Sequence, residues 1–221
     1  ATMAQRHIGG VVGYINLGSV KNVVSYVNIN NDKYGSQVTH AGGIIGSVGN
    51  DKTDIEKCMY YGNIHLNNSS DCIGGVIAYS NGGARVKNCA NLGTVTATQS
   101  GAYVGGILGY LNNTNPTIEN CYNYAKISDN GSGIHCGAII GWARNFNKSN
   151  IANNYYNKDT GNTPFGTDSK LGLSANEKTI SEFKCGEVAF KLNNSVTDGT
   201  QAWYQNIDNG LTPDDYLVFN G

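Results

Sequence analysis

The stretch Gly42-Gly43-Ile44-Ile45-Gly46 decides the fold, because close variants of it return at nearly constant spacing along the chain. The five copies, called here the glycine phrase, begin at residues 9, 42, 74, 105 and 137, so successive copies start 33, 32, 31 and 32 residues apart. A fixed period of roughly 20–50 residues is typical of a solenoid, in which each repeat buries its apolar face against its neighbours. The other copies are Gly9-Gly10-Val11-Val12-Gly13, Gly74-Gly75-Val76-Ile77-Ala78, Gly105-Gly106-Ile107-Leu108-Gly109 and Gly137-Ala138-Ile139-Ile140-Gly141.

A second pattern follows each glycine phrase: apolar residues three positions apart, as at Ile118, Cys121, Tyr124 and Ile127. These segments are too short and too rich in Gly and Asn for the amphipathic helices of a helical repeat. Short β-branched runs bounded by Gly, Asn and Ser favour strands instead. We therefore predict an all-β chain that forms a right-handed parallel β-helix of about five rungs of ~32 residues, with about three strands per rung.

Two local features of the repeat carry further expectations. The glycines are expected to allow close backbone approach or positive φ at corners. The adjacent pair Ile44-Ile45 is typical of a parallel strand that is buried on both faces. The spacing of three in the second pattern indicates a corner or kink, and it leaves the inward and outward faces there unassigned.

Composition excludes several classes of protein. The chain has 221 residues, a formal net charge of −1 and 14% charged residues, so it lacks the basic stripe of a nucleic-acid binder. Its 39% apolar content, arranged in repeats, is enough to bury a core. No apolar run approaches the roughly 18 residues of a membrane span. The chain starts without the segments of a signal peptide, so we expect a mature or excised part of a longer protein.

Three of the six cysteines, Cys58, Cys89 and Cys121, occupy one column of the repeat. Stacked rungs would place them roughly 4.8 Å apart, as buried free thiols. In-register parallel neighbours have poor geometry for a disulfide. No Cys-x-x-Cys and no histidine in the same register complete a tetrahedral metal site, so we expect neither a metal nor a cofactor.

The chain changes character after the repeats. We assign residues 1–157 to the solenoid and residues 158–221 to a C-terminal capping segment, with a turn-rich linker over 158–170. Thr179-Ile180-Ser181-Glu182 matches a capping box and predicts one short helix, interrupted by Gly186. A final strand is predicted at 216–219. A solenoid end exposes unpaired strand edges, so we predict that this small α+β segment covers the C-terminal rung.

The glycine phrase followed by Ile-Glu-Asn-Cys-Tyr-Asn at 118–123, or by Val-Lys-Asn-Cys-Ala-Asn at 86–91, resembles the GLUG repeat. The tail at 186–193 and 203–205 is similar to the segment that often follows such repeats, so the resemblance covers nearly the whole chain. The first repeat departs from it with Val23 in the cysteine column, and the fifth departs with Asn154.

GLUG repeats occur in secreted and surface proteins of gut bacteria and in non-catalytic parts of immunoglobulin-A-cleaving metalloproteases. The resemblance implies an extracellular or cell-surface, adhesin-like module, a monomer as part of a larger protein, with a host glycan or protein as its partner. It carries over no catalytic residue, because the HExxH zinc motif is absent from the sequence.

The acidic residues offer a weak case for catalysis. Glycoside hydrolysis needs two carboxylates that flank the scissile bond. Glu56 and Glu119 share a register two rungs apart, at roughly 9–10 Å, but Lys87 occupies the same column between them. We interpret the three as an outer ladder of alternating charges and predict no catalytic residues. A carbohydrate-active enzyme, or an accessory module of one, remains an alternative, as does a structural stalk without a ligand.

The residue after the glycine phrase is aromatic in four of the five repeats, with Ser47 in the second. Stacked rungs would align these side chains in a stripe that could bind a sugar or a protein through ring faces and hydroxyls. Alternation along the strand places Tyr110 with Val104 and Leu108, which favours burial. A second aromatic set flanks the cysteine column, and its adjacent pairs must point in different directions. The candidate ligand-binding residues are Tyr14, Tyr79, Tyr110 and Trp142 from the stripe, and Tyr60 and Tyr122 from the second set.

Overall fold

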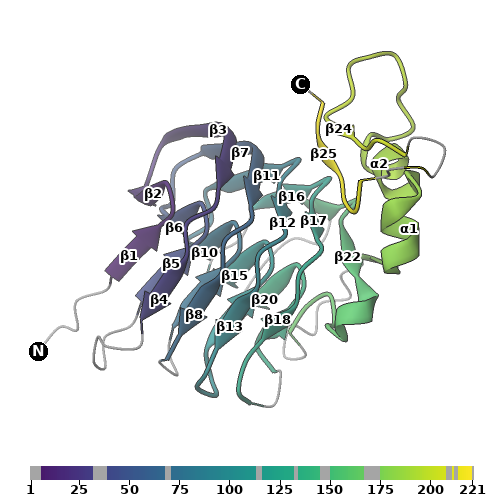
Figure 1. The fold of residues 1–221 in the computed structure, drawn as a ribbon. Coiled ribbons are helices and arrows are strands. Elements are labelled where there is room, and N and C mark those ends of the chain that lie inside the picture. Colours follow the sequence, from purple (N-terminus) through teal and green to yellow (C-terminus); the bar gives the residue numbers. More distant parts are fainter. Residues whose placement is uncertain are drawn as a thin grey trace, which may run out of the picture.

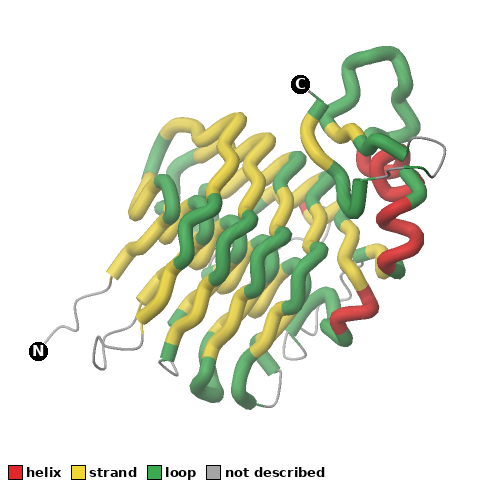
Figure 2. Tube along the Cα trace, in the orientation of Figure 1, coloured by secondary structure: helices red, strands yellow, loops and turns green. Residues whose placement is uncertain are grey.

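The computed structural model describes residues 6–31, 39–67, 71–112, 116–131, 134–144, 150–166, 175–207, 211 and 214–220. The chain coils into a parallel β-solenoid of about four turns, which confirms the predicted fold class (Figure 1). Figure 2 shows the strands stacked along the axis, with the helices of the C-terminal segment at one side. The repeat period sets this arrangement, since each turn pairs with its own copy in the next.

A complete turn contributes strands to four sheets within the described residues, so the predicted three strands per rung is corrected to four. Sheet A contains β1 (Arg6–Gly9), β5 (Thr39–Gly42), β9 (Cys72–Gly74), β14 (Tyr103–Gly105) and β19 (Cys136–Gly137). Sheet B contains β2 (Val12–Ile15), β6 (Ile45–Val48), β10 (Ile77–Ser80), β15 (Leu108–Leu111) and β20 (Ile140–Ala143). Sheet D contains β4 (Ile29–Asn31), β8 (Ile64–Leu66), β13 (Val95–Ala97) and β18 (Ile127–Ser128).

Sheet C is the largest, because some turns enter it as one long strand and others as two short ones. In the first two turns the long strands are β3 (Gly18–Ser25) and β7 (Thr53–Tyr60). Later turns supply β11 (Ala84–Lys87), β12 (Ala90–Asn91), β16 (Thr117–Glu119), β17 (Tyr122–Asn123), β21 (Ile151–Ala152) and β22 (Tyr155–Asn157), and β23 (Asn176–Lys178) pairs with β22.

The glycine phrases stack in register and lie close to neighbouring backbone. Gly42 pairs with Gly74 across sheet A. A Cβ added at Gly43 would lie 2.3 Å from the Gly75 carbonyl oxygen and 2.3 Å from the ring of Tyr60. None of the phrase glycines, all of which are described, has a positive φ. Close approach is therefore what requires glycine here, and the alternative of positive φ is wrong.

A column of left-handed residues explains the spacing of three in the second pattern. Residue Asn88 has φ 52°, and it separates Val86 from Cys89, which are both fully buried. A single left-handed residue resets the alternation of the strand, so positions three apart point to the same side. Asparagine suits this conformation better than most residues. The column, called here the corner column, consists of Asn22, Lys57, Asn88, Asn120 and Asn153, with φ values of 55°, 51°, 52°, 54° and 51°.

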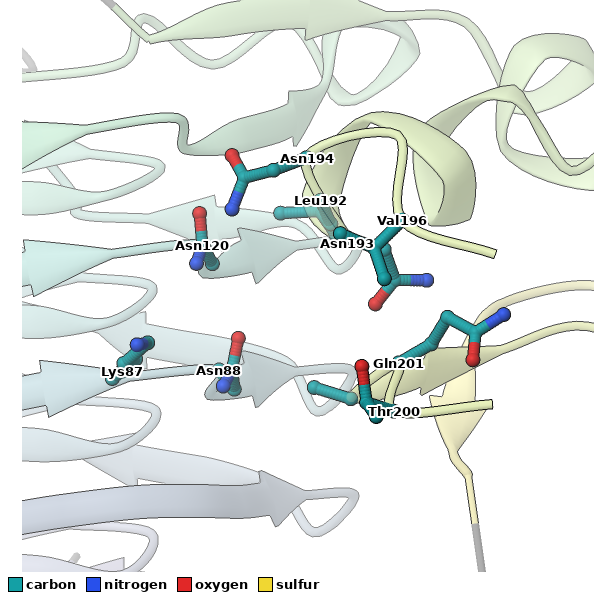
Figure 3. A pocket seen from close by; sticks show the side chains of 10 residues that line it. Lys87, Asn88, Asn120, Leu192, Asn193, Asn194, Val196, Thr200 and Gln201 are labelled. Atoms are coloured by element: carbon teal, nitrogen blue, oxygen red, sulfur yellow. The ribbon is translucent and has the colours of Figure 1, made fainter. Parts of the chain in front are cut away.

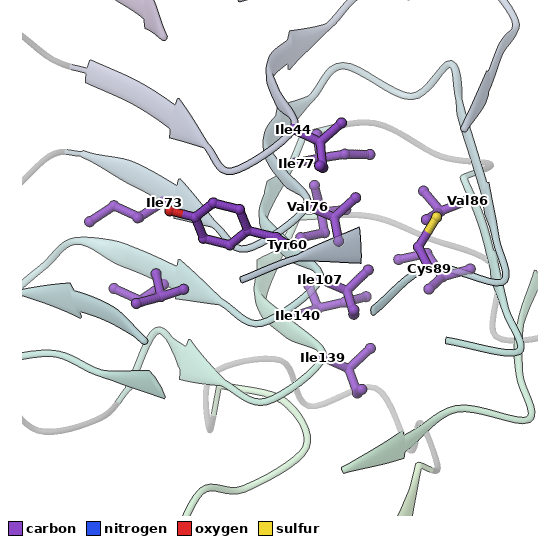
Figure 4. Packing of buried hydrophobic residues seen from close by; sticks show 14 of the residues in the cluster. Ile44, Tyr60, Ile73, Val76, Ile77, Val86, Cys89, Ile107, Ile139 and Ile140 are labelled. Atoms are coloured by element: carbon purple, nitrogen blue, oxygen red, sulfur yellow. The ribbon is translucent and has the colours of Figure 1, made fainter. Parts of the chain in front are cut away.

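The core runs along the axis and is built from aliphatic residues that repeat in every turn (Figure 4). Ile44 and Ile45 are both fully buried, because the chain bends between sheets A and B at this point. The bend, rather than one strand covered on both faces, accounts for the adjacent pair. Cys58, Cys89 and Cys121 are buried free thiols, as predicted for this column. The Cys89 backbone N–H donates to Cys121 Sγ at 3.3 Å.

The C-terminal segment contains two short helices in its described part, α1 (Ile180–Lys184) and α2 (Glu187–Leu192), rather than the one predicted. Gly186, with φ 82°, ends the first and begins the second. The capping box is confirmed, since Thr179 Oγ1 accepts from the Glu182 N–H and the Glu182 carboxylate accepts from the Thr179 N–H. The segment also contains the 3-10 helix η2 (Lys158–Thr160) and the antiparallel pair β24 (Trp203–Tyr204) and β25 (Val218–Phe219).

This segment covers the outer face of sheet C as well as the last turn. The predicted linker continues the coil up to residue 166, where the Ala138 N–H donates to the Thr163 carbonyl at 2.8 Å; residues 167–170 lie outside the described part. Trp203 Nε1 donates to the Asn120 carbonyl at 3.2 Å. A second apolar cluster joins Met59, Ala90, Tyr122 and Tyr155 of the coil to Phe183, Val188, Ala189, Leu192, Trp203 and Leu217 of the C-terminal segment.

Candidate functional site

Two columns of side chains meet along one side of the solenoid. The first lies on sheet B and holds the predicted stripe, and strand pairing aligns Tyr79 with Ser47 and with Tyr110. The second lies on sheet A, two residues before each glycine phrase, where His7 pairs with His40. We call their combined rings the aromatic–histidine face: Tyr14, Tyr79, Tyr110 and Trp142 from sheet B, and His7, His40, Tyr103 and His135 from sheet A.

The rings of this face stack on one another along the solenoid axis. The ring centroids of Tyr79 and Tyr110 are 5.4 Å apart with planes at 6°, and those of Tyr110 and Trp142 are 5.0 Å apart. Ser47 leaves a gap in the stripe, and the imidazole of His40 takes the place of the missing ring, 4.5 Å from Tyr79. The pairing of identical turns thus converts a sequence repeat into a continuous row of π systems.

Exposure differs along the row. Tyr14 in the first turn is 55% exposed, whereas Tyr79, Tyr110 and Trp142 are half-buried. Their faces cover one another, so mainly the ring edges and hydroxyls reach solvent. The rings of the stripe are therefore neither fully buried, as the sequence favours, nor fully exposed, as the alternative requires.

Amide side chains follow the hydroxyls along the same edge. Tyr79 Oη donates to Asn81 Oδ1 at 3.3 Å, and Tyr110 Oη donates to Asn112 Oδ1 at 3.4 Å. Asn112 Nδ2 then donates to Asn81 Oδ1 at 2.7 Å, which links two turns. The row of rings is therefore bordered by a row of amides that present both donors and acceptors.

The second aromatic set does not form part of a surface site. Tyr60 and Tyr122 have no exposed area, so the prediction that they bind a ligand is corrected. Tyr60 lies inside the coil and donates its hydroxyl to the Val27 carbonyl at 2.8 Å. Tyr122 lies under the C-terminal segment and donates to the Leu217 carbonyl at 2.6 Å.

A serine lies between two histidines at the base of the aromatic–histidine face. Ser47 Oγ is 2.6 Å from His7 Nδ1 and 2.8 Å from His40 Nδ1. The hydroxyl has one proton, so it donates to one ring and must accept the Nδ1 proton of the other. Burial lowers the pKa of His7, and burial together with the charge of His7 lowers the pKa of His40 to about 4. These neutral imidazoles act as packing and hydrogen-bonding groups.

The charged column on sheet C has the alternating order that the sequence predicts. Strand pairing places Lys87 between Glu56 and Glu119, and Lys21 Nζ lies 3.1 Å from Glu56 Oε2. Glu56 and Glu119 are therefore separated by a cation in the same column, which confirms the outer ladder. A shallow cavity of about 320 Å³ lies over it, lined by Lys21, Asp54, Glu56, Arg85, Val86, Lys87, Thr117 and Glu119.

Sequence reasoning missed the sheet A column as part of this face. The signal was present, because His7, His40, Tyr103 and His135 each stand two residues before the first glycine of a phrase. Cys72 holds the equivalent place in the third turn, where it pairs with His40. The repeat alone aligns His40, Cys72 and His135 in one column, which is interpreted from the sequence as a loop or edge position. Its contact with the stripe depends on how sheets A and B bring the two columns together.

Comparison with family models, with curated protein sequences and with solved structures returned no match. Across the described residues, no cluster of three or more His, Cys, Asp or Glu side chains could hold a metal ion. Within the same part of the chain, no helix has the length and apolar character needed to cross a membrane.

Proposed function

We propose that the chain is a non-catalytic module of a bacterial cell-surface or secreted protein, built from GLUG-like repeats, that binds a host glycan or glycoprotein. The observation that carries this proposal is the aromatic–histidine face, a row of partly exposed rings that extends through successive turns. Aromatic side chains with a polar tip are enriched where proteins bind other molecules. The amides of Asn81 and Asn112 border the row and supply donors and acceptors for hydroxyl groups.

The spacing of the face supports an elongated ligand. Equivalent groups recur at the strand separation of roughly 4.8 Å, so a ligand that lies along the axis meets similar chemistry in each turn. Tyr14, the most exposed ring, offers a face at the first turn. A glycan chain has this combination of repeated hydroxyls and apolar ring faces.

A glycan array, followed by calorimetry with the best ligand, tests the proposal. Tyr14→Ala is expected to weaken binding about tenfold, because it removes an exposed ring with little effect on the core. Tyr26→Ala is the matched control, since Tyr26 is 69% exposed but lies outside the aromatic–histidine face. Equal loss in both variants, or no binding to any glycan or host glycoprotein, would refute the proposal. The proposal would also be refuted if the protein cleaved a polysaccharide and Glu56→Ala or Glu119→Ala abolished that cleavage, because this result favours the enzyme alternative.

A structural stalk without a ligand is the second candidate, and one observation favours it. Tyr79, Tyr110 and Trp142 cover one another's faces, as rings do when they only stabilise a stack of strands. The stalk interpretation predicts that Tyr110→Ala lowers the denaturation midpoint while the array remains blank.

A further inference from the structure

A second cavity lies at the junction between the coil and the C-terminal segment (Figure 3). Its volume is about 150 Å³. On the coil side, Figure 3 shows Asn88 and Asn120 in adjacent turns of the corner column, opposite the end of α2 and the chain that follows it. The cavity is lined by Lys87, Asn88, Asn120, Leu192, Asn193, Asn194, Val196, Thr200, Gln201 and Ala202, none of which belongs to the aromatic–histidine face.

Hydrogen bonds hold the two walls of this cavity in place. Asn193 Nδ2 donates to the Trp203 carbonyl at 2.8 Å, and the Trp203 N–H donates to Asn193 Oδ1 at 2.9 Å. Across the junction, Asn153 Nδ2 donates to the Lys191 carbonyl at 3.0 Å and to Asn194 Oδ1 at 3.3 Å. The cavity is therefore built before any ligand arrives, as binding sites usually are.

The amide pairing of the corner column is interrupted at the cavity. Asn153 Nδ2 donates to Asn120 Oδ1 at 2.7 Å, but no equivalent bond joins Asn120 to Asn88 in the part of the chain that the structure describes. Asn88 is only 6% exposed, and its side-chain amide makes no hydrogen bond to another described residue. The buried side-chain atom of this lining that lacks a hydrogen-bond partner among the described residues is Gln201 Oε1, on the opposite wall. Such an atom is uncommon and calls for a group that binds there. Asn88 and Asn120 Nδ2 thus offer free donors, and Asn88 Oδ1 offers a free acceptor.

The opposite wall places apolar side chains beside polar ones such as Thr200 and Gln201, which narrows the chemistry of the ligand. Leu192, Val196 and Ala202 form its apolar part, and Lys87 is the one charged residue of the described lining. A small molecule with hydroxyls on its edge and an apolar ring face fits both walls. We propose that this cavity binds a single sugar ring, either a free monosaccharide or the terminal residue of a glycan. The choice of a sugar follows from this lining and does not rest on the function proposed for the aromatic–histidine face.

Saturation-transfer NMR with glucose, galactose, mannose, N-acetylglucosamine, N-acetylgalactosamine and N-acetylneuraminic acid tests this inference, with calorimetry on any sugar that binds. Asn88→Asp keeps a side chain that tolerates the left-handed conformation but removes the donor, so affinity is expected to fall about fivefold or more. Asn22→Asp is the matched control, in the same column and conformation but outside the cavity, and it should bind as the wild type does. Val196→Trp, at an exposed position, fills the cavity from the other wall and should abolish binding.

The same sugars presented at the ends of oligosaccharides separate a free monosaccharide from a glycan terminus as the preferred source. The inference is overturned if none of these probes gives a signal, or if Asn88→Asp and Val196→Trp leave the affinity unchanged. Binding that Tyr14→Ala lowers and the two cavity variants do not would place the sugar on the aromatic–histidine face alone. If only the cavity variants lower the affinity, the inference about the cavity is supported and the proposed binding on the aromatic–histidine face is refuted.

Discussion

The imidazole of His40 stacks on the phenol ring of Tyr79, with centroids 4.5 Å apart and planes at 8°. His40 is only 3% exposed, and its Nδ1 is 2.8 Å from Ser47 Oγ. Burial and the adjacent His7 lower the pKa of His40 to about 4, so the ring is neutral at neutral pH. Protonation would place a cation in this buried stack, next to a second histidine.

We predict that acidification destabilises the protein through His40. The pKa is about 6.5 in the unfolded chain and about 4 in the folded one, so the unfolded chain binds the proton first. The stability that the neutral His40 ring contributes is fully present above about pH 6.5 and is lost as the pH falls toward 4. The free energy of unfolding falls by up to about 3 kcal/mol over this range. Urea denaturation midpoints at pH 7, 6, 5 and 4 measure it. His40→Phe keeps a ring and removes the titration, so its midpoint should vary less; an unchanged pH dependence would contradict the prediction.

The titration of Asp71 changes the stability with pH in the direction opposite to that of His40. The two contributions must therefore be measured separately. Burial raises the pKa of Asp71 to about 6, so its contribution is present at low pH and is lost as the pH rises through 6. The comparison of wild-type His40 with His40→Phe is therefore best made in an Asp71→Asn background, which removes that titration from both proteins. Asp71→Asn alone should raise the midpoint at pH 7, because it removes a charge from a buried position where Oδ2 has no partner among the described residues.

Gly75 is predicted to tolerate no side chain. A Cβ there would lie 2.3 Å from Asn91 Cγ and 2.3 Å from the Gly106 carbonyl oxygen, in a backbone whose N–H donates to the Gly105 carbonyl. Gly75→Ala should destabilise the protein by at least about 2 kcal/mol, because the neighbouring turns must separate. The matched change Ala138→Gly, in the same column of the fifth turn, should cost about 1 kcal/mol or less. Equal shifts of the urea midpoint for both would show that the column is not tightly packed.

The fold could be predicted from the sequence because in-register stacking repeats the same contacts in every turn. Five glycine phrases at a constant period leave few architectures, and the column of Cys58, Cys89 and Cys121 follows directly from the alignment. The faces of sheet C could not be assigned, because a single left-handed residue such as Asn88 shifts the alternation by one position. The packing of the C-terminal segment on the outer face of sheet C could not be predicted either, since its contacts with Tyr122 there have no repeat to reveal them.

The site was predicted only in part, for a related reason. The stripe of Tyr79, Tyr110 and Trp142 follows from the repeat alone. Its junction with the histidines depends on the bend between sheets A and B, which brings His40 onto Tyr79. The cavity beside Asn88 depends on how the non-repeating end of the chain folds back, and no periodic signal encodes that arrangement.

Lys57 is predicted to be the weakest residue of the corner column. It has φ 51°, where the other four members are asparagine, and a long side chain gains nothing from this conformation. Lys57→Asn should therefore stabilise the protein by about 0.5–1 kcal/mol, which corresponds to a rise of roughly 1–4 °C in Tm. Lys52→Asn removes the same charge from an exposed position that lacks a positive φ, and it serves as the control. A rise in both variants would assign the effect to charge rather than to the backbone.

The thiols are predicted to differ sharply in reactivity, although all six cysteines are described and free. Cys185 is exposed, whereas the other five are buried. Burial raises the pKa of Cys136 to about 12 and that of Cys89 well above its usual value, which suppresses the reactive thiolate. In the native protein, Ellman's reagent should modify one thiol quickly and the remainder only after unfolding, and Cys185→Ser should abolish the fast phase. The prediction would be contradicted if more than one thiol per chain reacted quickly, or if the fast phase persisted in Cys185→Ser. The proposed extracellular location makes the result informative, because an oxidising environment would otherwise cross-link free thiols; burial of the column protects them without a disulfide.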